Sequence, residues 1–160
     1  MSEVELTSEL VIAMIAGMQD KKKSIDEYYK RFDSKYPRRT EIEKRYKKVV
    51  DEISELMGDT LRSSQFRRTP LFYTMFLALY HRMYGIPQSK IPRGGSDKLA
   101  SHERMAFRKA VDSLSLIVAD ARKDKIKKGY EAFVGASLRQ TDNIRPRETR
   151  LKTLYELAFA

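Results

Sequence analysis

The 160-residue sequence contains no cysteine and no tryptophan, and it has only two histidines. The lack of cysteine excludes disulfide bonds and thiolate metal ligands, and it is typical of a reducing compartment. The longest apolar run, from Leu10 to Met18, has about half the length that a membrane-spanning helix needs. The N-terminus has Glu3, Glu5 and Glu9 where a signal peptide would carry basic residues. We therefore expect a cytoplasmic protein that does not enter a membrane.

The two histidines, His81 and His102, offer few ways to build a catalytic centre. His81 lies in an apolar segment, so we interpret it as a hydrogen-bonded histidine of the core or its rim. His102 precedes Glu103, but no second histidine lies one helical turn away to form a zinc pair. Neither histidine lies in a recognisable nucleophile–base context. We predict no catalytic residue, no metal site and no cofactor.

Helical periodicity extends over nearly the whole chain and predicts an all-α fold. We expect one compact domain, residues 1–160, with about six to seven helices around a central apolar helix at about 70–84. The expected helices span 5–19, 24–36, 39–57, 71–84, 97–123 and 128–139, and a last one begins after 141–143. Residues 86–96, rich in proline and glycine, are expected to form a mobile loop capped by Ser96 or Asp97.

Local signals set several of these boundaries. Ser24-Ile-Asp-Glu27 has the spacing of a capping box, and Gly58 supplies a helix stop. Thr69-Pro70 combines a hydroxyl cap with a proline suited to the first turn. The glycines of Arg93-Gly-Gly-Ser-Asp-Lys98 suggest a phosphate-binding loop, but the preceding strand and the Gly-Lys-Ser/Thr order of a Walker loop are absent.

The formal net charge is +10 and it is unevenly distributed. Residues 21–50 carry twelve bases and five acids, a sum of +7, and residues 61–95 carry six bases and no acid. Acidic segments, 1–20 and 51–60, each contribute −4. Separated basic blocks are typical of a protein with a polyanionic partner such as DNA, although a solvated surface explains them equally simply.

Basic residues at helix ends are the candidate contacts with a nucleic-acid backbone. The candidates are Lys21, Lys22, Lys23, Arg67, Arg68, Arg139, Arg145, Arg147 and Arg150. The last four surround the start of the final helix, whose free amide groups attract anions. The alternative is that several of these arginines pair with Glu148, Asp142 or the carboxyl ends of helices.

Three segments resemble the helical second half of the GmrSD-type restriction family, which comprises ParB-like domain proteins of bacterial defence. They are Glu5-Leu followed by Ser8-Glu-Leu, Ala13-Met-Ile-Ala-Gly17 and Ser24-Ile-Asp-Glu-Tyr-Tyr29; Arg67-Arg-Thr-Pro-Leu-Phe72; and Ser137-Leu-Arg-Gln-Thr141 with the arginines before Leu151. In that family a separate α/β domain with an Asp-Gly-Gln-Gln-Arg-type motif is catalytic. This sequence has no such motif, so no catalytic residue is carried over.

The resemblance implies a non-enzymatic helical module of a restriction or phage-defence protein. Such a module would contact the nucleic-acid backbone or dock a ParB-like catalytic domain, in the same chain or in another. The alternative is a structural, oligomerising bundle that uses its Tyr-rich second helix as an interface.

Overall fold

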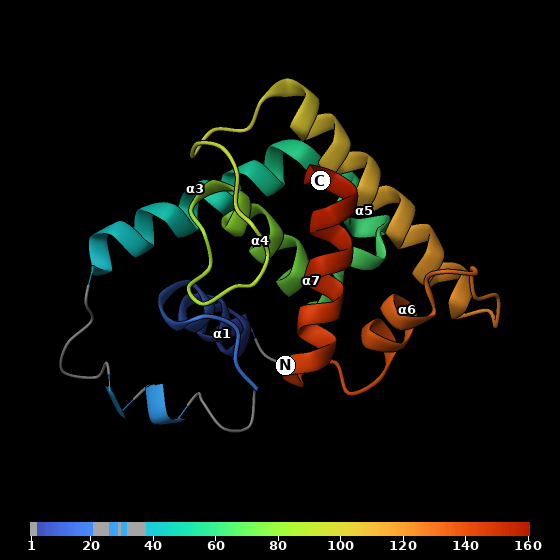
Figure 1. Ribbon diagram of the computed structural model, residues 1–160, viewed down its shortest axis with the longest axis horizontal. Helices are drawn as coiled ribbons and strands as arrows, with labels where there is room; N and C mark the ends of the chain where they lie inside the picture. The colour runs from blue at the N-terminus through green and yellow to red at the C-terminus, as the bar shows by residue number, and fades with distance from the viewer. Residues whose placement is uncertain (1–2, 21–25, 29, 32–37) are drawn as a thin grey trace.

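The computed structural model describes residues 3–20, 26–28, 30–31 and 38–160. The α-helices are α1 (Glu3–Ala16), α3 (Arg39–Met57), α4 (Thr69–Met83), α5 (Ser101–Ala121), α6 (Glu131–Leu138) and α7 (Ile144–Phe159), with 3₁₀ helices η1 (Gly58–Ser63) and η2 (Gln65–Arg67). They form one compact bundle (Figure 1), and no strand occurs among the described residues. The predicted all-α fold is confirmed. The capping box at Ser24 and the three lysines 21–23 lie outside the described residues.

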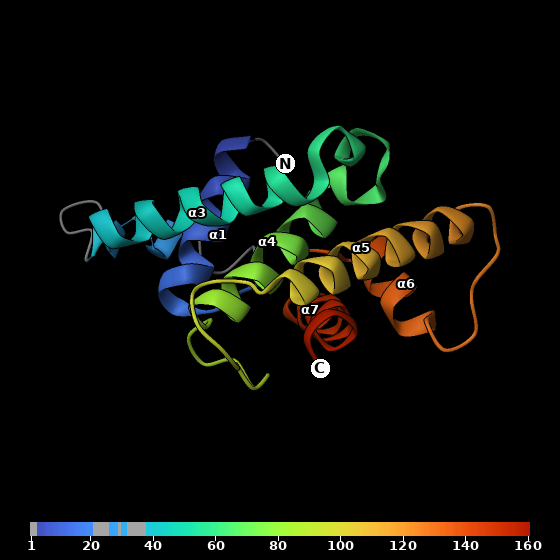
Figure 2. The same ribbon diagram turned by 90° about the horizontal axis from the view of Figure 1, so that it is seen from above.

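The apolar sequence of α4 is matched by its burial. Leu71 and every residue from Tyr73 to Met83 are buried. The helix contacts α1, α3, α7 and η2, so its different faces meet different partners (Figure 2). Its start differs from the prediction, because Arg68 occupies the cap position in an extended conformation and Thr69 is already helical. Pro70 lies in the first turn, where its missing N–H costs no hydrogen bond.

Helices α5, α6 and α7 form the other part of the bundle, and α7 packs against α4, α5 and α6. The rings of Phe107 on α5 and Phe159 on α7 stack with centroids 5.7 Å apart. The start of α5 was predicted four residues too early. Ser96 and Asp97 do not cap it; instead the Glu103 carboxylate accepts a hydrogen bond from the Ala100 N–H at 3.1 Å. A carboxylate in the first turn also interacts favourably with the helix dipole.

Gly17 ends α1 where the chain meets the loop after α4. Its φ is +93°, and a Cβ atom there would lie 2.6 Å from the Pro87 carbonyl oxygen. We expect Gly17→Ala to lower the free energy of unfolding by about 2–3 kcal/mol, because it combines backbone strain with a clash. Gly129 has a φ of +92° with open space around it, so Gly129→Ala should cost only about 1 kcal/mol. Urea unfolding measures both, and equal losses would contradict the close approach at Gly17.

Candidate functional site

Arg150 is fully buried between three elements of the bundle. Its guanidinium donates to the Thr74 hydroxyl at 2.9 Å, the Ala136 carbonyl at 2.6 Å and the Thr141 carbonyl at 3.0 Å. Burial lowers the pKa of Arg150 to about 10. The side chain therefore joins α7 to α4, to α6 and to the turn between α6 and α7.

Arg147 lies one turn earlier on α7 and is 3% exposed. Its guanidinium forms a buried ion pair with Glu9, donates to the Gln19 carbonyl at 2.7 Å and lies 4.4 Å from the centre of the Tyr73 ring. Burial raises the pKa of the Tyr73 hydroxyl to about 12. Arg147 thus ties α7 to α1 across the bundle.

These two placements correct the prediction that Arg147 and Arg150 contact a nucleic-acid backbone. Both side chains are enclosed and hydrogen-bonded to protein groups, so neither can reach a phosphate in this structure. The alternative of pairing with helix carboxyl ends fits Arg150, because Ala136 lies in the last turn of α6. Arg139 and Arg145, predicted together with them, are exposed.

Arg67 and Arg68 meet a third arginine that the sequence analysis did not single out. Arg122 follows α5, and its Nη1 donates to the Gln65 side chain at 3.3 Å. The pKa of Arg68 is lowered by burial first and then by the positive charges of Arg122 and Arg67. The structure thus places Arg122 near two arginines, Arg67 and Arg68, that are remote from it in sequence.

The short helix η2 is fixed against α5 by hydrogen bonds around Ser115. The Ser115 hydroxyl accepts from the Gln65 N–H at 2.8 Å, and the Ser64 hydroxyl donates to it at 3.2 Å. The next side chain, Phe66, is fully buried. These contacts hold the backbone of Arg67 and Arg68 in place beside the end of α5.

Arg122 also begins a basic turn that leads from α5 to α6 and lies at the far end of α5 in Figure 2. We define the basic end surface as Arg67, Arg68, Arg122, Lys123, Lys125, Lys127 and Lys128. All of these except the partly buried Arg68 are exposed, and within the described part of the chain none of them forms an ion pair. The turn could have been noticed in the sequence, as five bases with one acid between 122 and 128.

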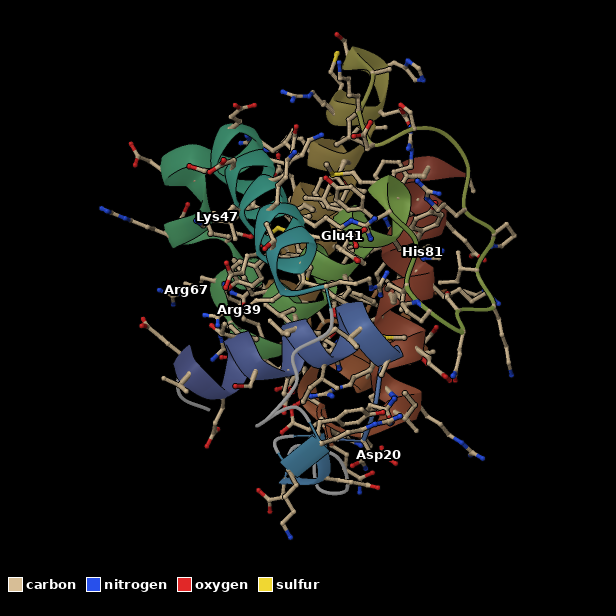
Figure 3. The ribbon with its side chains drawn as sticks, turned by 90° about the vertical axis from the view of Figure 1, so that its left-hand side faces the viewer. Asp20, Arg39, Glu41, Lys47, Arg67 and His81 are labelled. Atoms are coloured by element: carbon tan, nitrogen blue, oxygen red, sulfur yellow. The ribbon has the colours of Figure 1, made fainter. Side chains whose placement is uncertain are left out.

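Nine basic residues elsewhere in the described ranges form ion pairs with acids. Arg39 pairs with Glu43 at 3.0 Å, Lys48 with Asp97 at 3.3 Å and Arg104 with Glu52 at 2.7 Å. Figure 3 shows Arg39 and Lys47 on the outside of α3 and Arg67 on the outside of the segment before α4. Arg62, Arg93, Arg139 and Arg145 are likewise in no ion pair among the described residues. The basic end surface is therefore distinguished by how many such bases gather on it, and not by the lack of ion pairs alone.

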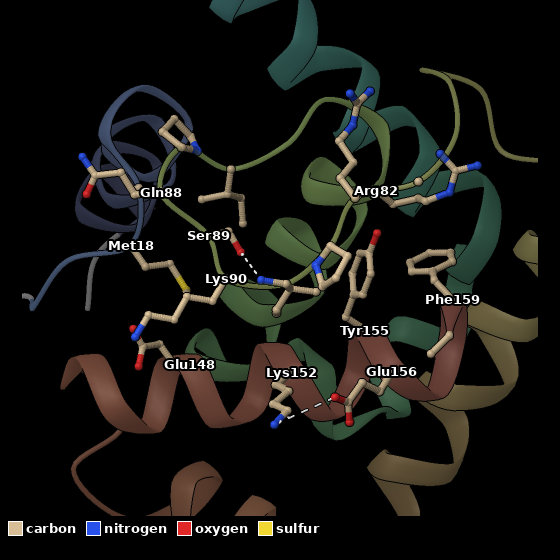
Figure 4. A pocket seen from close by; sticks show the side chains of 18 of the residues that line it. Met18, Arg82, Gln88, Ser89, Lys90, Glu148, Lys152, Tyr155, Glu156 and Phe159 are labelled. Atoms are coloured by element: carbon tan, nitrogen blue, oxygen red, sulfur yellow. Dashed lines mark hydrogen bonds and ion pairs between the residues drawn. The ribbon is translucent and has the colours of Figure 1, made fainter.

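A cleft of about 1030 Å³ lies between the loop 86–95, the end of α1 and α7 (Figure 4). Its floor includes Tyr155 and Phe159. Its charged lining is mixed, with Lys90, Arg93, Lys152, Glu148 and Glu156. Since both signs alternate, the cleft does not favour a polyanion.

His81 holds the loop that forms the roof of this cleft. The Ile86 N–H donates to Nδ1 at 2.9 Å, so Nε2 carries the proton and donates to the Ile91 carbonyl at 2.8 Å. The interpretation of His81 as a hydrogen-bonded histidine of the core is confirmed. Nearby, Arg82 forms two hydrogen bonds with Glu103, at 2.5 and 2.6 Å, and lowers the pKa of that carboxyl.

Acidification should loosen the loop through His81. Burial, and to a lesser degree the charge of Arg93, lowers the pKa of His81 below 6.5, while the bond to Ile91 opposes the shift. The neutral ring is favoured in the fold, so its contribution to stability is complete above pH 6.5 and is lost as the pH falls through the lowered pKa. His81→Gln keeps a donor and an acceptor but does not titrate. Urea unfolding of both proteins from neutral to acid pH should show wild-type stability falling relative to the variant; parallel curves would contradict this.

Comparisons with protein families, with curated proteins and with solved structures returned no match for this chain. They give no support to the resemblance to GmrSD-type proteins, which stays a prediction. Among the described residues, no group of three or more His, Cys, Asp or Glu side chains is arranged to hold a metal ion. The described helices include none that has both the length and the apolar character to cross a bilayer.

Proposed function

We propose that this protein is a non-enzymatic helical module that binds the phosphate backbone of nucleic acid through its basic end surface. The observation that carries the proposal is the gathering of Arg67, Arg68 and Arg122 without a carboxylate partner in the described chain. Like charges held together repel each other, and a polyanion relieves that repulsion while it releases counterions.

The adjacent basic turn supports this choice of partner. Its four lysines extend the positive surface beyond the three arginines, as expected for a backbone that carries a charge at regular intervals. Side chains that contact phosphates position a protein without reading the base sequence. We therefore expect binding that depends strongly on salt and weakly on sequence.

Fluorescence anisotropy with a labelled duplex tests the proposal. From about 50 to about 200 mM salt, the logarithm of the association constant should fall linearly with the logarithm of the salt concentration, with a slope of about −5 if most of the seven cations contact phosphates. Duplexes of unrelated sequence should give similar constants. Undetectable binding at the lowest salt concentration would contradict the proposal.

The resemblance to restriction proteins extends the proposal to a place beside a ParB-like nuclease domain, in cis or in trans. Pull-down of such a domain by the purified chain tests this separately. The oligomerising bundle stays a prediction, since most of its proposed Tyr-rich interface lies outside the described residues. Light scattering over a range of concentrations tests it, and a strict monomer would count against it.

A further inference from the structure

We propose that Arg67, Arg68 and Arg122 form a seat that holds a single phosphate group at a fixed position. The inference rests on the proposed function, under which the phosphate is a phosphodiester of the nucleic-acid backbone. The inference adds to the proposed function because it divides the basic end surface into two parts. The three arginines bind an individual phosphate, and the lysines of the turn provide a general positive potential.

The three arginines come from two separate parts of the fold, and they are close enough for the charges of Arg122 and Arg67 to lower the pKa of Arg68. Arg67 ends η2, Arg68 connects η2 to α4, and Arg122 follows the last residue of α5. The bond from Arg122 Nη1 to the Gln65 side chain places the third guanidinium at the start of η2, the short helix that ends at Arg67. Arg68 is partly buried, which makes the mutual repulsion stronger than it would be in open water.

Their hydrogen-bonding capacity is incompletely used. Arg68 Nη1 is buried and has no hydrogen-bond partner, although buried polar atoms nearly always have one. No ion pair joins any of the three arginines to an acid of the described chain. Guanidinium groups offer donors in a fork that matches the oxygens of phosphate. The exposed guanidinium groups of Arg67 and Arg122 are the ones that an oxyanion with several acceptors can reach directly, and Arg68 Nη1 would meet it only after a shift of its side chain.

The backbone that carries the arginines is fixed in advance. Ser115 holds Gln65 from α5, and the buried ring of Phe66 anchors η2 in the core. A rigid support favours binding at one position over diffuse attraction. The lysines at 123–128 differ, because an ammonium group is a point charge on a flexible side chain without a fork.

Titration with inorganic phosphate, with sodium chloride at matched ionic strength as the reference, tests the seat. Backbone amide shifts should saturate with phosphate at residues 65–69 and 122, and chloride should not reproduce them. Arg68→Lys keeps the charge but loses the fork, so it should weaken phosphate binding about tenfold. Arg122→Lys serves as a second variant should the first unfold. Arg39→Lys, an exposed change on α3, should have no effect.

Parallel anisotropy measurements with a duplex separate this inference from the proposed function. Weaker duplex binding by Arg68→Lys at an unchanged salt slope supports a phosphodiester in the seat. Saturation by phosphate without duplex binding supports the seat but assigns it to a small phosphate compound. If the backbone amide shifts with phosphate are no larger than those with chloride, the phosphate-binding seat is contradicted. The proposed function is then tested by duplex binding alone.

Discussion

Replacing Arg150 with Met is expected to lower the free energy of unfolding by about 3 kcal/mol. The variant fills most of the space but leaves the carbonyls of Ala136 and Thr141 without their buried donor. Each unsatisfied buried group costs about 1–3 kcal/mol. Removing a buried charge offsets part of that loss, since burial already lowers the pKa of Arg150 to about 10. Urea unfolding followed by circular dichroism measures the change.

Arg145→Met is the matched control, because Arg145 is exposed on the first turn of the same helix. It should change the free energy of unfolding by less than about 0.5 kcal/mol. If Arg150→Met were as stable as wild type, the buried hydrogen bonds would contribute nothing net. The gain from removing a buried charge would then equal the cost of the lost hydrogen bonds, which would contradict the predicted stabilising role of Arg150.

The triple variant Arg67→Gln, Arg68→Gln and Arg122→Gln should bind duplex DNA about a hundredfold more weakly at low salt. It removes three of the seven charges of the basic end surface, so the salt slope should become shallower by about 2–3. The substitutions remove no ion pair of the described chain. We therefore expect the unfolding midpoint to stay close to that of wild type, which separates loss of binding from loss of fold.

The matched control removes three charges that already have acidic partners. Arg38 pairs with Glu41, Arg39 with Glu43 and Lys152 with Glu156. Replacing these three bases with Gln lowers the net charge equally but should leave the salt slope almost unchanged. Equal effects of the two triple variants would show that binding follows net charge alone and that no surface is specific.

Much of the fold follows from short-range signals in the sequence. The helix ending at Met57, the stop at Gly58 and Pro70 in the first turn of α4 were predicted from local patterns. The start of α5 was placed wrongly, because the Ala100 N–H is satisfied by Glu103 and not by the hydroxyl or carboxylate before it. Where α5 begins depends on the position of the preceding loop, residues 86–96. Arg82 on α4 fixes the end of that loop by donating a hydrogen bond to the Ser96 carbonyl.

The candidate site was predicted less well, for a physical reason. A sequence shows that Arg147 and Arg150 are basic but not that Glu9, remote in the chain, lies beside one of them. Likewise, nothing local relates Arg122 to Arg68, which meet only because Ser115 fixes η2 against α5. Whether an arginine is available to a ligand or is used in hydrogen bonds within the protein depends on such long-range pairing.

Chemical-shift mapping with a short duplex tests the central claim most directly, because it locates the contact. We expect the largest backbone amide shifts at residues 65–69 and 120–130, with little change around Arg147 and Arg150. Shifts confined to the start of α7, with the basic end surface unaffected, would contradict the account.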